Sequence, residues 1–212
     1  MCEAPDMRSL PWCLVLLISC AHSGPVAEHH FDDAEAWAQR FEDPTRDQWQ
    51  RPDEVIAALQ LTPQTKVADI GAATGYFPVR FAKVAARVYG IDIESSMVEY
   101  LTHRAERESL NNLTAVLASS DDAKIPEPVQ LITIIDTYHH LENRPVYFTA
   151  LRRSLAPGGR IAIIDFRMGS ARGPPAEAKV SAETVIAELK AAGFTLEARH
   201  EFLPDQYFVV FH

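Results

Sequence analysis

Short apolar runs alternate along the chain with longer segments in which apolar residues recur every three or four positions. The short runs are typical of parallel strands that are covered on both faces, and the longer segments of amphipathic helices. The predicted strands span residues 66–70, 87–91, 113–117, 130–135 and 160–165. The predicted helices span residues 75–86, 95–109, 143–155 and 181–192. This alternation predicts an α/β fold with a doubly wound, Rossmann-like sheet.

The end of the chain departs from that alternation. Residues 194–199 and 206–211 read as two strands separated by a Leu-Pro-Asp turn, which predicts an antiparallel hairpin. The sheet is therefore expected to be mostly parallel, with a C-terminal antiparallel strand. Gly193 is expected to end the preceding helix. Ser96 and Glu99 fit a capping box near the start of the helix at 95–109.

The first residues resemble a targeting segment. The apolar run at 10–20 is shorter than the roughly 20 residues that span a membrane, and small residues follow it. Residues 1–22 are thus predicted to be a signal peptide or lipoprotein signal. Leu-Ile-Ser-Cys at 17–20 resembles a bacterial lipobox, so Cys20 is a candidate lipidation site and membrane tether. Export or membrane anchoring is the expectation, with a cytoplasmic location as the alternative.

Two further segments complete the predicted organisation. Residues 23–51 are expected to form a linker and a helix, because apolar residues recur at helical spacing between 31 and 42. Trp37, Trp49 and Gln50 precede the first predicted strand, and the two aromatic side chains are candidates to close over a ligand as a lid, with packing in the core as the alternative. Residues 52–212 are expected to form one domain, which the total length of 212 residues suits.

Charge and cysteine content exclude several classes of function. The formal net charge of −9 argues against nucleic acid as a partner, because phosphate binding needs a basic surface. All three cysteines lie within the first 20 residues. The predicted domain therefore has no disulfide framework, thiolate metal site or cysteine nucleophile.

The segment at residues 67–75 carries the strongest chemical signal. A strand ends near Asp69, a turn of small residues follows, and a helix is expected at once, an arrangement that brings backbone N–H groups close to a ligand. No Lys-Ser or Lys-Thr follows Gly75, which excludes a P-loop. Ala73 and Tyr76 stand where a dinucleotide fingerprint needs glycine, which disfavours an NAD-dependent oxidoreductase.

An acidic residue ends the next strand. Asp92 follows Gly71 by 21 residues, where a carboxylate can accept hydrogen bonds from both hydroxyls of a ribose. The expected ligand therefore contains a ribose but needs no phosphate.

These residues resemble the motifs of the class I S-adenosylmethionine-dependent methyltransferases. Residues 67–75 match the first motif except at Ala73, and Asp92 matches the ribose-binding acid. Residues 119–126 resemble the adenine-binding third motif, 131–136 its fourth strand, and 155–160 the turn before strand five. The resemblance implies the seven-stranded methyltransferase fold and S-adenosylmethionine as cofactor. The implied cofactor-binding residues are Asp69, Gly71, Ala73, Gly75, Tyr76, Asp92, Ile93, Asp121, Asp122 and Asp136.

The residues after the fourth predicted strand are candidates for catalysis. His139 or His140 is a candidate base for a hydroxyl or amine acceptor, and Tyr138 a candidate for the acceptor pocket. The alternative is that one histidine packs under the loop and the other is solvated. No metal site is expected, because adjacent histidines point in different directions.

Two functions remain open at this stage. The first is methyl transfer to an unidentified small-molecule or lipid acceptor, because no large insertion offers a separate acceptor domain. The second is a non-catalytic cofactor-binding or scaffold protein. Ala73 motivates it, because its Cβ is expected to hold φ negative where the family's glycine is free.

Overall fold

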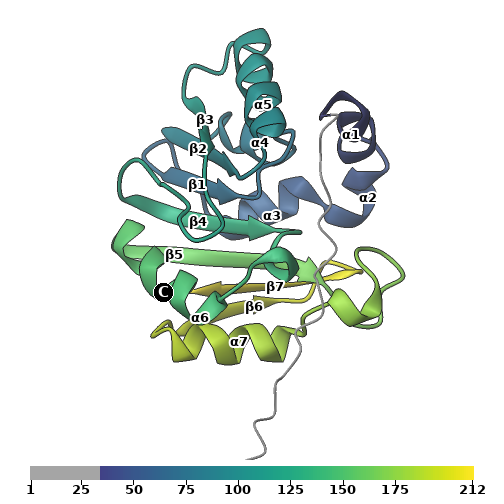
Figure 1. Ribbon diagram of the computed structural model, residues 1–212, viewed down its shortest axis with the longest axis vertical. Helices are drawn as coiled ribbons and strands as arrows, with labels where there is room; N and C mark the ends of the chain where they lie inside the picture. The colour runs from purple at the N-terminus through teal and green to yellow at the C-terminus, as the bar shows by residue number, and fades with distance from the viewer. Residues whose placement is uncertain (1–33) are drawn as a thin grey trace, which may run out of the picture.

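The computed structural model describes residues 34–212, and these form a seven-stranded sheet with helices on both faces (Figure 1). The strand order is β3-β2-β1-β4-β5-β7-β6. Strands β1 to β5 run parallel, whereas β7 is antiparallel to β5 and β6 is antiparallel to β7. The strands are β1 Lys66–Ile70, β2 Arg87–Asp92, β3 Leu113–Leu117, β4 Val129–Ile135, β5 Leu155–Phe166, β6 Leu196–His200 and β7 Gln206–Phe211. The predicted fold class, including the antiparallel C-terminal end, is confirmed.

Seven α-helices accompany the sheet within the described residues. They are α1 Ala34–Phe41, α2 Arg46–Gln50, α3 Pro52–Leu59, α4 Pro78–Phe81, α5 Ser95–Arg107, α6 Arg144–Leu151 and α7 Ala182–Ala191. Short 3₁₀ turns cover Tyr138–His140, Arg152–Ser154 and Ala176–Ala178. None of the helices within residues 34–212 has the length and apolar content needed to cross a membrane. The predicted signal segment, Cys20 included, and residues 23–33 lie outside the described residues.

The helix predicted at 75–86 is wrong in extent, since α4 covers only Pro78–Phe81. Gly75 has a φ of +95°, which is not helical, so the helix cannot begin there. Beyond Phe81, the side-chain amide of Asn112 donates to the carbonyl oxygens of Ala82 and Ala85 at 2.8 and 2.9 Å. These bonds use carbonyl groups that a continuing helix would need.

The predictions for the C-terminal end of α7 and the N-terminal end of α5 had opposite outcomes. Gly193 follows α7 with a φ of +88°, so the predicted helix end there is confirmed. The capping box is wrong, because α5 begins at Ser95 and its N-cap is Glu94, without a side-chain cap.

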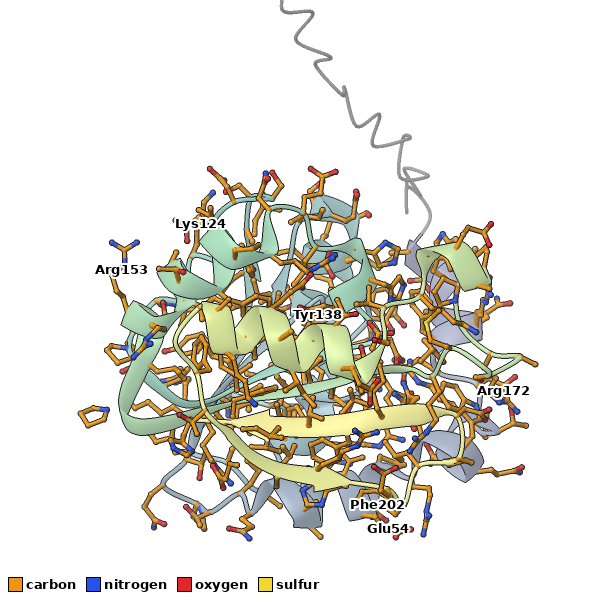
Figure 2. All side chains as sticks on the ribbon, turned by 90° about the horizontal axis from the view of Figure 1, so that it is seen from below. Glu54, Lys124, Tyr138, Arg153, Arg172 and Phe202 are labelled. Atoms are coloured by element: carbon orange, nitrogen blue, oxygen red, sulfur yellow. The ribbon has the colours of Figure 1, made fainter. Side chains whose placement is uncertain are left out.

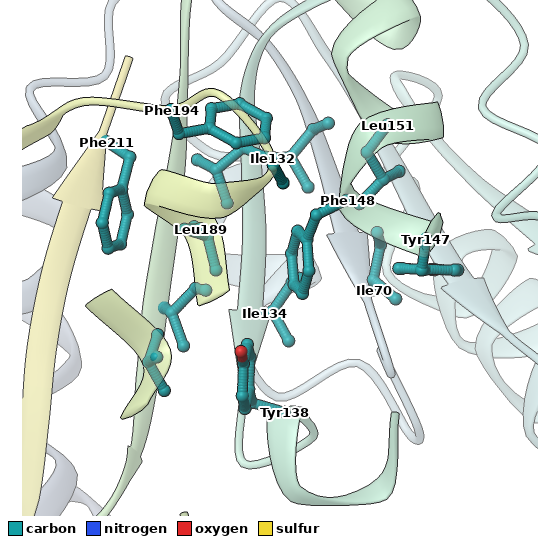
Figure 3. Packing of buried hydrophobic residues seen from close by; sticks show 14 of the residues in the cluster. Ile70, Ile132, Ile134, Tyr138, Tyr147, Phe148, Leu151, Leu189, Phe194 and Phe211 are labelled. Carbon is teal, nitrogen blue, oxygen red and sulfur yellow. The ribbon is translucent and has the colours of Figure 1, made fainter. Parts of the chain in front are cut away.

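Alternate residues of each central strand face two separate cores. On one face, α6 and α7 contribute Phe148 and Leu189 to a cluster with Ile132 of β4 (Figure 3). On the other, α3 and α5 contribute Leu59 and Leu101 to a second cluster. Both faces of the sheet are thus covered, as its parallel strands require.

The strand order reverses direction at the centre of the sheet. The chain moves outward from β1 through β2 to β3, then returns to place β4 on the other side of β1. In open α/β sheets, ligands bind beyond the carboxyl ends of the strands at this switch point. The residues that follow β1, β2, β4 and β5 are therefore the ones to inspect.

Candidate functional site

The turn after β1 is built from left-handed backbone. Gly71, Ala73 and Gly75 have φ values of +76°, +45° and +95°. A Cβ at Gly71 would lie 2.1 Å from the Thr137 hydroxyl, and one at Gly75 would lie 2.4 Å from Leu101. Both glycines are therefore required by close packing as well as by conformation.

The expectation that Ala73 holds a negative φ is wrong. Its φ of +45° places it in the left-handed region, which costs an L-residue roughly 1–2 kcal/mol. The Ala73 N–H donates to Oδ2 of Asp92 at 2.8 Å, and this charge-assisted bond offsets part of that cost. The turn thus keeps a left-handed shape without the middle glycine.

Asp92 joins the turn to the end of β2. Its Oδ1 accepts the Glu94 N–H at 3.0 Å, while Oδ2 accepts the Ala73 N–H. Burial raises the pKa of Asp92, and the backbone N–H groups of Glu94 and Ala73 oppose that rise. Each oxygen keeps a second lone pair for a further donor. A carboxylate that the backbone holds in place and that can still accept fits the hydroxyls of a ribose.

An apolar surface lies beside this carboxylate. Ile93 follows Asp92 and is 58% exposed, and Leu117, which pairs with Asp92 across β2 and β3, is 47% exposed. Large apolar side chains at this exposure are suited to cover the flat face of a base. Together with Asp92 they fit a ribonucleoside, as S-adenosylmethionine contains.

Asp121 and Asp122 lie farther out, in the turn that follows β3. Both are exposed. Asp121 accepts the Ser119 hydroxyl at 2.7 Å, which lowers the pKa of Asp121, and Asp122 accepts the Lys124 N–H at 2.9 Å. The Ala118 N–H donates to the Asp92 carbonyl at 2.8 Å, so this segment begins against the end of β2.

Asp69 and Asp136 lie on the inner side of the same edge. Asp69 is 3% exposed and accepts the hydroxyl of Thr133, its partner in the β1–β4 register. Burial raises the pKa of Asp69 to about 7. Asp136 follows β4 with a φ of +56°, and burial raises its pKa as well.

The carboxylate of Asp136 is surrounded by donors from distant parts of the chain. Arg46 and Gln50 of α2 donate to Oδ2 at 3.0 and 3.1 Å, and the Gln206 side-chain amide of β7 donates to Oδ1. The structure therefore places Asp136 at the switch point but commits its side chain to holding α2 against the sheet.

The N-terminal segment also contacts the turn directly. The Tyr76 hydroxyl donates to Asp47, and the guanidinium groups of Arg46 and Arg80 lie 3.9 and 4.0 Å from the centre of the Tyr76 ring. Glu42 accepts the Thr74 hydroxyl at 2.8 Å. This position is the one that the lid prediction requires, although whether the segment moves stays a prediction.

The three candidates after β4 separate in the structure. Tyr138 does not reach the site: it is fully buried, its hydroxyl donates to Glu188 of α7, and its ring stacks on Phe148 with centroids 5.5 Å apart (Figures 2 and 3). It belongs to the core because the 3₁₀ turn directs it beneath α7. His140 is exposed. Nδ1 of His139 lies 2.9 Å from Asp165, at the end of β5.

Sequence reasoning did not single out several residues that shape this edge. They are Arg46, Thr133 and Gln206. Asp165 is different, because an acid at the end of a predicted strand is a local signal and marks it as a candidate from the sequence. The other three had no such signal, since each acts only through a residue that is distant in the sequence.

Comparison with known proteins agrees with this geometry. The family described as "Methyltransferase domain" matches residues 61–199. The ubiquinone/menaquinone biosynthesis C-methyltransferase UbiE of Burkholderia multivorans is 32% identical over 119 residues, which cover 52% of this chain and 47% of that protein. A demethylmenaquinone methyltransferase of Tropheryma whipplei is 29% identical over 108 residues, covering 51% and 44%. The chain thus spans about half the length of the curated relatives it matches.

Solved structures extend the likeness over most of the chain. An S-adenosylmethionine-dependent methyltransferase from Aquifex aeolicus has a TM-score of 0.77 and 26% identity, covering 83% of this chain and 96% of that one. DhpI, solved with S-adenosylhomocysteine, has a TM-score of 0.66 and 16% identity, covering 86% and 94%, which speaks for the fold alone. The chain belongs to the S-adenosylmethionine-dependent methyltransferase family.

Proposed function

We propose that the protein transfers a methyl group from S-adenosylmethionine to a small-molecule acceptor. The observation that carries this proposal is the turn of Gly71, Ala73 and Gly75, held in left-handed conformation against the carboxylate of Asp92. It lies at the switch point of the sheet, where ligands of such folds bind.

Different residues at this edge of the sheet bind different parts of the cofactor. Asp92 accepts the ribose hydroxyls, and Ile93 and Leu117 cover the base, with Asp121 or Asp122 near its amino group. The turn, with Asp69 behind it, receives the amino-acid part. S-adenosylmethionine supplies a methyl group already activated by the positive charge on sulfur. The protein therefore contributes mainly alignment and exclusion of water.

The proposed acceptor class follows the names of the matched relatives. The matched relatives are named for methylation of quinone precursors, which are small and lipid-like. Each match covers about half of this chain, so a quinone precursor is one acceptor to test rather than an assignment. We also propose that the protein is exported and anchored to the membrane by a lipid on Cys20. If a Cys20→Ser variant stays in the membrane fraction, the proposed lipid anchor at Cys20 is wrong.

The alternative is a protein that binds the cofactor without turnover. The left-handed φ of Ala73 weakens its main motivation, because the turn is not distorted by the missing glycine.

Transfer of labelled methyl tests the proposal. Wild-type protein is incubated with methyl-labelled S-adenosylmethionine and the small-molecule and lipid fractions of a bacterial extract. We expect label in an organic-soluble product with wild type and none with Asp92→Ala. Cofactor binding without label in any fraction would favour the non-catalytic alternative.

A further inference from the structure

His139 and Asp165 form a buried pair at the carboxyl ends of β4 and β5. Nδ1 of His139 lies 3.0 and 2.9 Å from the two carboxylate oxygens of Asp165. Asp165 Oδ2 also accepts the His139 backbone N–H at 3.1 Å. The side chains are 6% and 3% exposed. Two contacts to one carboxylate fix both the backbone and the ring of His139.

This contact determines which ring nitrogen can act as a base. A carboxylate only accepts hydrogen bonds, so Nδ1 carries the hydrogen and Nε2 keeps its lone pair. Within residues 34–212, the hydrogen bonds of His139 go to Asp165 alone, and Nε2 makes none. An imidazole oriented by a carboxylate through one nitrogen and open at the other is the arrangement of a general base.

The pair lies next to the cofactor turn rather than apart from it. Thr137, two residues before His139, lies so close to Gly71 that a Cβ there would be 2.1 Å from its hydroxyl oxygen. The two neighbours that compete with His139 are placed differently, since Tyr138 is in the core and His140 is exposed.

Aromatic side chains extend from one side of the pair. The Phe166 ring is inclined at 64° to that of His139, with centroids 6.5 Å apart, and the Trp49 ring centroid lies 6.0 Å from that of Phe166. The guanidinium of Arg172 lies 5.1 Å from the Trp49 ring and at the rim of the molecule (Figure 2). Such a wall suits a flat, apolar acceptor.

On the basis of the proposed function, the geometry points to His139 as the general base for a phenolic hydroxyl of a flat aromatic acceptor, with Asp165 as its positioning residue. The hydroxyl proton moves to Nε2. The oxygen forms the new O–C bond with its electron pair, while the C–S bond of the donor breaks and its pair stays on sulfur. The proton on Nε2 then leaves to solvent. An aliphatic hydroxyl holds its proton too tightly for imidazole, and a thiolate needs no base.

The test uses 1,4-naphthohydroquinone as phenolic probe and cyclohexanol as aliphatic control, with labelled S-adenosylmethionine. We expect methylation of the naphthohydroquinone alone. His139→Ala is expected to lower kcat about 100-fold to 1,000-fold. Added imidazole should raise the kcat of His139→Ala at least tenfold. If His139 had only a structural role, imidazole would not restore activity. The affinity for S-adenosylhomocysteine should change less than about twofold, and exposed His103→Ala should match wild type in all respects.

A second readout needs no acceptor and no variant of His139. The ¹⁵N spectrum of the imidazole groups, recorded with S-adenosylhomocysteine bound, should show His139 with hydrogen on Nδ1, and Asp165→Asn should abolish that preference.

The inference would be overturned by an unchanged kcat in His139→Ala, or by a loss of activity in that variant that imidazole does not rescue. It would also be overturned by hydrogen on Nε2 of His139 in the wild type. Methyl transfer to neither probe, or to cyclohexanol as readily as to naphthohydroquinone, would contradict it as well. If wild type fails to bind S-adenosylhomocysteine at all, the proposed function itself fails, and the role of His139 with it.

Discussion

The two halves of the strand edge are built in different ways. Around β1 and β2, backbone groups make the site, and its key contact joins Ala73 and Asp92, only 19 residues apart. Around β4 and β5, side chains make it, and Asp136 is held by Arg46 and Gln206, which are 90 and 70 residues away. The first half is suited to a ligand common to a whole family, and the second to one that varies between its members.

The largest effect on stability is expected in the half around β4 and β5, which depends on residues distant in the sequence. Asp136→Asn replaces an acceptor of three side-chain donors with an amide that itself donates, leaving Arg46 without its counter-charge. The pair is 15% and 20% exposed, so we expect a loss of about 3 kcal/mol in the free energy of unfolding, measured by urea titration.

Glu183→Gln provides the matched control, because it breaks the exposed pair with Arg199, whose side chains are 71% and 38% exposed. Its cost in the free energy of unfolding should be much smaller than that of Asp136→Asn, because solvent screens an exposed pair. Equal losses in the two variants would show that Asp136 is no more than a surface ion pair.

A smaller effect on stability is expected from the substitution of Asp69, which lies behind the turn. Its folded pKa of about 7 lies above the unfolded value near 3.9, so the folded state binds the proton more tightly. Wild-type stability therefore gains from this group as the pH falls from about 7 toward 4, and loses that gain as the pH rises. Asp69→Asn keeps an acceptor for Thr133 and does not titrate.

Asp69→Asn should therefore be more stable than wild type at pH 8, by roughly 1–2 kcal/mol, and the difference should shrink at pH 5. Thermal unfolding at the two pH values measures it. A difference that is independent of pH would mean that Asp69 is ionised throughout.

The smallest effect is expected inside the turn. Ala73→Gly removes the left-handed strain but adds freedom to the unfolded chain, so the two terms nearly cancel and the free energy of unfolding should rise by about 0.5 kcal/mol. Chemical denaturation checks this. A loss of stability would mean that the methyl group of Ala73 contributes packing that outweighs the strain.

The same contrast explains what the sequence could predict. The strands at 66–70 and 113–117 match the structure residue for residue, because apolar runs and their flanking turns are local signals. The family motifs around Gly71 and Asp92 are local in the same sense. The helix at 75–86 was overextended because Asn112, 26 residues after its predicted end, takes two of its carbonyl groups.

Side chains placed by long-range contacts escaped prediction. Tyr138 carried the same local signal as His139, yet Glu188 and Phe148 draw it into the core. Asp136 was a cofactor candidate from its position after β4, but its partners Arg46 and Gln206 could be identified only once the chain was folded. The acceptor half of the site is therefore where structure adds most.

Calorimetric titration with S-adenosylhomocysteine tests the central claim most directly. Wild type should bind it with one site per chain. Asp92→Ala should weaken binding by roughly 30-fold or more, because the ribose hydroxyls and the N–H groups of the turn both lose the carboxylate that accepts their hydrogen bonds. Glu106→Ala, an exposed change on α5, should bind as wild type does. No binding by wild type, or equal binding by Asp92→Ala, would contradict a cofactor site at this turn.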